Sequence, residues 1–110
     1  QKYDVLFKHA TEAMIIIQKG IIVRINSPLL QLVGYSSEEV IGTLFIRYVH
    51  PDDFTKVKAI SNIRIAGNNT PFIYRIRIKR KDKSFISVEI KAGMILYREQ
   101  PADFALVNRA

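Results

Sequence analysis

Two stretches in the second half of the chain, Phe72–Arg80 and Phe85–Leu96, alternate between apolar and polar residues, and this feature restricts the fold most. Their core-type positions all carry even numbers: Tyr74, Ile76, Ile78, Ile86, Val88, Ile90 and Ala92. A period of two with one apolar face is typical of half-buried antiparallel strands. The two stretches therefore predict a β-hairpin.

Parity restricts the register of this hairpin. Because a slip of one residue would turn charged side chains into the core, opposed residues must have numbers with an even sum. The loop between the strands then has an odd length, most simply Lys81-Asp82-Lys83. In this register Ile78 faces Ile86, and Arg75 faces Glu89 as an opposite-charge pair worth roughly 0.2–1 kcal/mol.

Further strands are expected on either side of a helical region. The β-rich runs Met14–Gln18 and Ile21–Ile25 are separated by Lys19-Gly20, and glycine supplies the positive φ that a tight hairpin needs. Near the end of the chain, Tyr97–Ala102 contains a proline and predicts a turn, and Asp103–Asn108 predicts a short last strand.

The region between the strand pairs has the start and stop signals of two short helices. Asn26 or Ser27 can cap the first helix, and Gly34 can end it in a left-handed conformation. Ser36 or Ser37 can cap the second helix, and Gly42 stops it.

A long helix and a further short one are also predicted. His50-Pro51-Asp52-Asp53 opens a helix that reaches about Ala66, and its inward stripe consists of Phe54, Val57, Ile60 and Ile63 or Arg64. Residues 2–12 have a weak apolar stripe at helical spacing. That leading helix could cover the domain's own sheet or mediate dimerisation.

Composition bounds the class of protein. At 110 residues the chain suits one domain over residues 1–110, with a leading helix at 1–12 and a core at 13–108. It has no cysteine, which excludes disulfides, thiolate nucleophiles and sulfur-ligated metals. Its longest apolar run, Ala13–Ile17, is far below the roughly 18 residues of a membrane span. The chain begins with Gln1, so we expect it to be part of a longer protein.

The net charge of +7 raises the question of nucleic-acid binding. Much of that charge lies on the predicted hairpin, in Arg75, Arg77, Lys79, Arg80, Lys81 and Lys83. No base-stacking aromatics are interleaved with these cations, as single-strand binders require. We interpret them as a solvated strand face and expect no nucleic-acid partner.

Catalytic and metal-binding patterns are weak. His50 with Asp52 and Asp53 could form a metal site, but a helix start explains these residues better. The paired Glu38-Glu39 lies at a helix cap and not across a cleft, as acid–base carboxylates should. The sequence therefore predicts no catalytic site and no metal site, and a domain that is not an enzyme.

The stretch Asn26–Asp53 reads NSPLLQLVGYSSEEVIGTLFIRYVHPDD. This series resembles the PAS sensor family, in which an N…GYs.eEl.G…hPdD pattern follows the first hairpin, and the resemblance extends from about Leu6 to Asn108. It implies an α+β fold: a five-stranded antiparallel sheet in the order 2-1-5-4-3, with helices covering one face. The chain departs from the family pattern at Lys83, which replaces a turn glycine and would be mildly strained, and at Val107-Asn108-Arg109, which replaces Asp-Ile-Thr.

The resemblance also allows the family's cofactors to be compared with this sequence. Flavin-adduct photosensors need the cysteine of an Asn-Cys-Arg motif, and thioester chromophores also need a cysteine; this chain has none. Haem-binding relatives carry a histidine within the long helix, and Asp52–Ala66 has none. Relatives with non-covalent flavin usually have a tryptophan near the ring, which is absent here. A small apolar ligand, bound non-covalently, is the class of ligand that these comparisons do not exclude.

Such a ligand would occupy a cavity between the sheet and the helices. The candidate lining residues are Ile15, Ile17, Leu30, Val33, Ile41, Tyr48, Val57, Ile60, Tyr74, Ile76, Val88 and Ile90. Tyr74 and Tyr48 would be its hydrogen-bond partners. The alternative is that these large side chains fill the space as a packed core without a ligand.

The resemblance implies a non-catalytic sensory module of a larger signalling protein. It would relay ligand binding or dimer rearrangement to an output domain in the same chain, either a histidine kinase or a cyclic-dinucleotide enzyme. We expect a homodimer in the cytoplasm without membrane contact by this domain, although the parent protein could be membrane-anchored. A ligand-free dimerisation domain is the first alternative, and a basic nucleic-acid-binding domain is the second, less favoured one.

Overall fold

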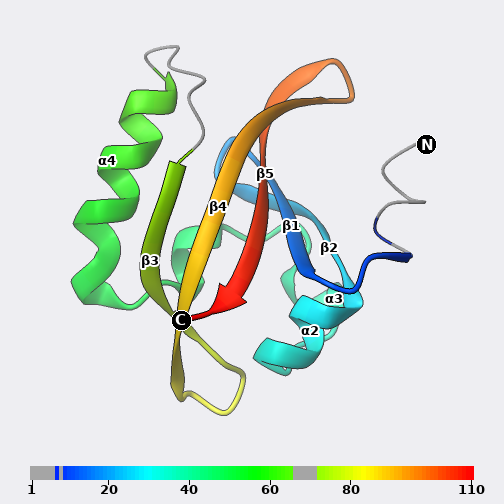
Figure 1. Cartoon of the computed structure of the whole chain (residues 1–110), viewed down its shortest axis with the longest axis vertical. Coiled ribbons are helices and arrows are strands. Elements are labelled where there is room, and N and C mark those ends of the chain that lie inside the picture. The colour runs from blue at the N-terminus through cyan, green and yellow to red at the C-terminus, as the bar shows by residue number, and fades with distance from the viewer. Residues whose placement is uncertain (1–6, 8, 66–71) are drawn as a thin grey trace.

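The computed structural model describes residue 7, residues 9–65 and residues 72–110. Its elements, in chain order, are β1 (Ala13–Gln18), β2 (Ile21–Ile25), α2 (Ser27–Val33), α3 (Ser37–Val40), the 3₁₀ turns η1 (Phe45–Tyr48) and η2 (Pro51–Asp53), α4 (Phe54–Ile65), β3 (Phe72–Lys79), β4 (Phe85–Tyr97) and β5 (Gln100–Arg109). Figure 1 shows the strands as one twisted sheet, with α4 to one side of it and α2 and α3 near β2.

The sheet has the order β2-β1-β5-β4-β3, and each neighbouring pair is antiparallel. This confirms the predicted α+β fold and strand order. Most of the predicted helix at residues 2–12 lies outside the described residues. Phe7 and His9 have helical backbone, whereas residues 10–12 do not.

The β3–β4 hairpin has the predicted register. Arg75 pairs with Glu89 and Ile78 pairs with Ile86. The amide of Arg80 donates to the carbonyl of Ser84 at 2.8 Å, which leaves a three-residue loop. In that loop Lys83 has a φ of 73°, the left-handed conformation in which a lysine is mildly strained.

The turn predicted at residues 97–102 is present but is shorter than expected. β4 continues to Tyr97 and β5 begins at Gln100, so only Arg98 and Glu99, both with positive φ, form the turn. Pro101 therefore lies inside β5. It is tolerated there because β1 pairs with β5 only as far as Asp103, so the missing amide removes no ladder bond to β1.

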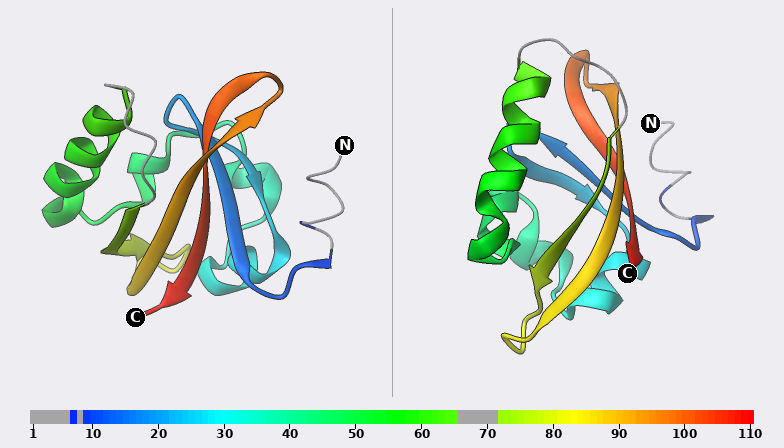
Figure 2. Two further views of the ribbon diagram at one scale, coloured as in Figure 1. Left: turned by 45° about the horizontal axis from the view of Figure 1, so that its top comes forward. Right: turned by 60° about the vertical axis from the view of Figure 1, so that its left-hand side comes forward.

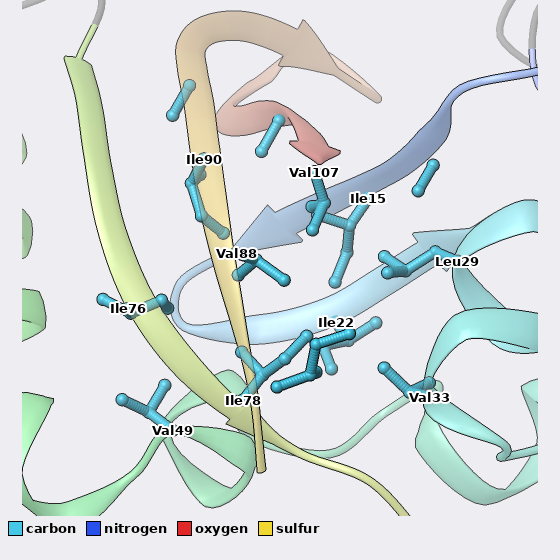
Figure 3. Close-up of a cluster of buried hydrophobic side chains, with 14 of the residues drawn as sticks. Ile15, Ile22, Leu29, Val33, Val49, Ile76, Ile78, Val88, Ile90 and Val107 are labelled. Carbon is cyan, nitrogen blue, oxygen red and sulfur yellow. The ribbon is translucent and has the colours of Figure 1, made fainter. Parts of the chain in front are cut away.

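The two faces of the sheet are buried by different elements. The view at the right of Figure 2 shows α4 to one side of the sheet, and residues of α2, α3 and α4 share one core cluster with the strands. The larger core lies on that side, and Figure 3 shows its side chains from the strands and α2 pointing toward one another. On the opposite face a smaller group, which we call the outer cluster, consists of Phe7, Ile16, Tyr97 and Ala102, with Met14, Val23, Ile95 and Phe104 packed against it.

Asn26 joins the first hairpin to α2. Its side-chain oxygen accepts from the amide of Leu29 at 3.3 Å, which caps the helix, and from the amide of Met14 at 2.9 Å. Its side-chain amide donates to the carbonyl of Glu12 at 2.7 Å. The residue is only 3% exposed, so these bonds satisfy polar atoms that would be costly to bury unpaired.

The caps of both short helices match the sequence signals. Gly34 ends α2 with a φ of 83°, and Ser36 caps α3 in a capping box with Glu39. Gly42 follows α3 with a φ of 88°. The long helix differs from the prediction because its first residues form η2, and regular α-helix starts at Phe54.

Candidate ligand cavity

Two cavities lie on the helical side of the sheet. The smaller one, of about 40 Å³, is lined mainly by aliphatic and aromatic side chains of the strands, α2 and η1. Leu29, Val33 and Ile22, seen together in Figure 3, form part of its wall. A volume of this size holds little more than water. This half of the interior is therefore essentially a filled core.

The larger cavity, of about 290 Å³, lies between α4, η1 and the sheet, and we call it the helix–sheet cavity. It is lined by Ile15, Ile17, Gly20, Leu44, Phe45, Ile46, Val57, Lys58, Ile60, Ser61, Tyr74, Ile90, Ala92, Asp103 and Ala105. The volume approaches that of small-molecule sites. Short side chains help to create it, since Ala92 and Ala105 are buried on the sheet where longer residues would fill the space.

Eight of the twelve candidate lining residues contact one of these cavities. The helix–sheet cavity is lined by Ile15, Ile17, Val57, Ile60, Tyr74 and Ile90, whereas Val33 and Tyr48 line the smaller cavity. Ile76 and Val88 are buried within the core and line neither cavity. Leu30 is half-buried against the core. The adjacent Leu29, and not Leu30, lines the smaller cavity.

The prediction that Ile41 lines the cavity is wrong. We expected it to point inward, but it is 44% exposed and lines neither cavity. The reason is that α3 has only four residues and ends at Val40, which is 2% exposed and faces the core. The backbone is extended at Ile41, so its side chain turns toward solvent.

Sequence reasoning missed the polar lining of the helix–sheet cavity. Lys58 and Ser61 of α4 and Asp103 of β5 all contribute to the wall. The signal for Asp103 was available, because it has the same parity as Ala105 and Val107, whose side chains are buried on the helical side.

An ion pair fixes the N-terminal end of α4 to β3. The amide of Arg77 donates to Asp53 Oδ2 at 2.8 Å, and its guanidinium donates to Oδ2 at 3.1 Å and to Oδ1 at 3.0 Å. The Asp53 residue is only 7% exposed. Hydrogen bonding from the Arg77 side chain is the main cause that lowers the pKa of Asp53, and burial partly opposes it. Arg77 therefore has a structural role that its place among the solvated charges did not indicate.

His50 and Asp52 complete this junction. The amide of Asp52 donates to His50 Nδ1 at 3.0 Å, so the imidazole caps η2, and the ring lies 4.4 Å from the ring of Phe85. These contacts, with those of Asp53, account for the residues considered above as a metal site. Within the described part of the chain, no group of three or more His, Cys, Asp or Glu residues could hold a metal ion.

Tyr48, expected as a ligand partner, is already paired. Its hydroxyl lies 2.8 Å from Thr43 Oγ1, and its ring packs edge-on against Tyr35 with the centroids 5.3 Å apart. Burial, followed by the proximity of Tyr48 and Glu39, raises the pKa of Tyr35. Tyr74 of the helix–sheet cavity is half-buried and remains next to the space that a ligand would fill.

Acidic partners offset part of the basic charge on the β3–β4 hairpin. Arg77 is bound by Asp53, Lys81 Nζ lies 2.9 Å from Glu39, and Arg75 lies 3.7 Å from Glu89. The hairpin is thus less basic than its composition suggests. None of the helices over residues 9–65 and 72–110 has the length and apolar character needed to cross a membrane.

Comparisons with known proteins agree with this geometry. The PAS domain of an HTR-like protein from Haloarcula marismortui superimposes with a TM-score of 0.81 at 18% identity, covering 99% of this chain and 89% of that one. A PAS domain from a two-component sensor histidine kinase gives 0.80 at 17% identity, covering 99% and 95%. A PAS domain of a protein from Colwellia psychrerythraea gives 0.80 at 20% identity, covering 99% and 94%.

Two sequence comparisons were informative in different ways. A search of the curated proteins gives no match. The family model described as the PAS fold matches residues 1–107, which is nearly the whole chain. The fold, the strand order and this match together show that the chain belongs to the PAS family.

Proposed function

We propose that this PAS domain is a non-catalytic sensory module that binds a small ligand and relays its presence to an output domain of a larger signalling protein. The helix–sheet cavity is the observation that carries the proposal: it has a volume of about 290 Å³ and a mostly apolar wall. Pockets that bind small molecules combine such walls with a few polar groups. The ligand would be held non-covalently.

The packing of α4 supports a route for the signal. Asp53 fixes the start of α4 to Arg77 of β3, and the side chains of Val57 and Ile60 further along the helix line the cavity. Occupancy of the cavity would favour one position of α4 relative to the sheet, which is a shift between packing states. The sheet would then pass the change to the terminal segments and to the output domain.

A histidine kinase or a cyclic-dinucleotide enzyme is the output domain that we propose. The likeness to the PAS domain of a sensor histidine kinase supports the first alternative through the fold. In the full-length protein, substitutions of Arg75 or Glu89 on the sheet should alter the output activity. Unchanged output across these variants would contradict transmission through the sheet.

Native mass spectrometry of the purified domain tests ligand binding directly. A mass above the sequence value is expected, because a fitting ligand would survive gentle purification, and the excess mass would indicate its class. An Ala105→Leu variant is the matched control, since added methylenes in the cavity should exclude the ligand. A bare protein that also binds nothing from a panel of small apolar compounds would argue against a ligand sensor.

A ligand-free dimerisation domain is the second candidate, and it concerns the sheet face that carries the outer cluster. This cluster places Phe7 edge-on against Phe104 with ring centroids 6.2 Å apart, on the sheet face opposite the helices. A homodimer that uses the leading segment and this face is part of the proposal. Deleting residues 1–12 should then give monomers in light scattering, and persistent dimers would rule out this contact.

A further inference from the structure

The inward stripe of α4 is bordered by polar residues that also reach the helix–sheet cavity. It begins with the half-buried Phe54 and the buried Val57. Four residues after each of them come Lys58 and Ser61, which the helical period places on the same side. Both side chains line the helix–sheet cavity. Lys58 and Ser61 are both exposed, so they lie where the cavity meets solvent.

The rest of the wall is largely apolar. Ile17, Ile90 and Ala105 of the sheet, with Ile60 of α4 and the ring of Tyr74, surround the space. A ligand that fills this part must present hydrocarbon, since burying an unpaired polar group costs free energy.

The charged groups at the cavity are not equivalent. Asp103 already has an interaction partner within the chain. Lys56, which does not line the cavity, donates to the carbonyl of Arg75 at 2.7 Å. By contrast, no salt bridge to Lys58 is found among the described residues, so its ammonium is available at the rim while its stem covers apolar surface.

We infer that the helix–sheet cavity takes an amphiphilic monocarboxylic acid. Its hydrocarbon chain would lie against Ile17, Ile90 and Ala105, and its carboxylate would accept hydrogen bonds from Lys58 Nζ and Ser61 Oγ. An ammonium paired with a carboxylate gives a charge-assisted bond, and the hydroxyl adds a second donor. This inference rests on the proposed sensory function and specifies the chemistry of its ligand.

Three probes of equal chain length test the head group: octanoate, 1-octanol and octylamine. Binding to the purified domain is measured by isothermal titration calorimetry at low and at moderate salt. Octanoate should bind most tightly. The Lys58→Gln variant should weaken octanoate by about three- to fivefold, the range of a solvent-exposed ion pair, and should leave 1-octanol unchanged. Lys91→Gln, which removes an exposed lysine on the opposite face, is the charge-matched control.

The outcomes separate the two proposals. If 1-octanol binds as tightly as octanoate and Lys58→Gln has no effect, the carboxylate assignment is wrong while the cavity remains a ligand site. Tighter binding of octylamine would also overturn it and would favour Asp103 as the recognising group. If none of the probes binds, the carboxylic-acid assignment fails, and the native mass of the purified domain decides the proposed ligand-sensing function separately. Ala105→Leu, or Ala92→Leu where the first variant does not fold, should abolish binding of all three.

Discussion

The free backbone groups of the two edge strands, β2 and β3, are hydrogen-bonded by different kinds of partner. Along β2, backbone pairs with backbone: the amide of Ile22 donates to Thr43 at 2.9 Å, the amide of Gly42 donates to Ile22 at 2.8 Å, and the amide of Phe45 donates to Gly20 at 2.9 Å. The segment after α3 thus acts as a short additional strand. An open edge would be a template for pairing with other chains.

Along β3, charged side chains share this task with backbone. The amide of His50 donates to the carbonyl of Arg77 at 2.9 Å, Asp53 accepts from the amide of Arg77, and Lys56 donates to the carbonyl of Arg75. The hydrogen bonds at the β2 edge join backbone groups and depend on chain conformation. Those made by side chains at the β3 edge depend on charge. We therefore expect the β3 edge to respond to pH and to single substitutions that leave the β2 edge unchanged.

The largest effect is expected from Asp53→Ala, which removes the main contact of the β3 edge. Loss of charge-assisted hydrogen bonds by a buried carboxylate should lower the free energy of unfolding by about 2 kcal/mol. Urea denaturation measures this change. Asp52→Ala is the matched control, because the side chain of Asp52 is 73% exposed and lies 4.0 Å from Arg77. Equal effects of the two variants would contradict the assignment.

Acid should weaken the β3 edge selectively. Because the pKa of Asp53 is lowered in the folded protein, its stabilising contribution is present above the ordinary aspartate pKa of about 3.9 and is lost as pH falls through the folded value. The difference in unfolding free energy between wild type and Asp53→Asn should therefore shrink steadily below about pH 4. Urea titrations from pH 7 to pH 2 test this, and a difference independent of pH would count against it.

A smaller effect is expected at the β2 edge from Gly42→Ala. Gly42 has a φ of 88° and open space where a Cβ would lie, so the cost of about 1 kcal/mol comes from backbone conformation alone. Gly93→Ala is the control, since it also has open space but no positive φ, and it should be neutral or slightly stabilising. This loss should be the same at pH 7 and pH 4, unlike that at Asp53.

The smallest effect is expected from Lys56→Gln. Its single exposed hydrogen bond to the carbonyl of Arg75 should contribute about 0.5 kcal/mol. Lys58→Gln, in the same helix and with the same change of charge, should leave stability within experimental error. Thermal unfolding of both variants makes this comparison, and a larger loss from Lys58→Gln would reverse their assigned roles.

The sequence predicted the elements whose rules are local. The parity of Ile78 and Ile86 determined the β3–β4 register. The family resemblance, which has a glycine in this turn, indicated the left-handed Lys83 that the structure contains. Caps at Asn26 and Ser36 followed from side-chain chemistry. In each case residues within a few positions of one another decide the outcome.

Features that depend on distant partners could not be derived in this way. Alternation placed Arg77 on a solvated face, and only the position of Asp53 beside the edge of β3 reveals the ion pair. Likewise, the turn assigned to Pro101 ignored that β1 ends before reaching it. Of the cavity, the large apolar wall residues could be anticipated, but not Lys58 and Ser61, because the stripe expected for α4 did not include these two positions.

The central place of β5 has a consequence for synthesis of the chain. β5 pairs with β1 on one side and with β4 on the other, yet it is made last of the five strands. Until it leaves the ribosome, the sheet can exist only as two separate hairpins, β1–β2 and β3–β4, each with an unpaired inner edge. Pairing that spans most of the sequence is slow, so completion of the sheet should be the late step, joining the first and last strands of the domain.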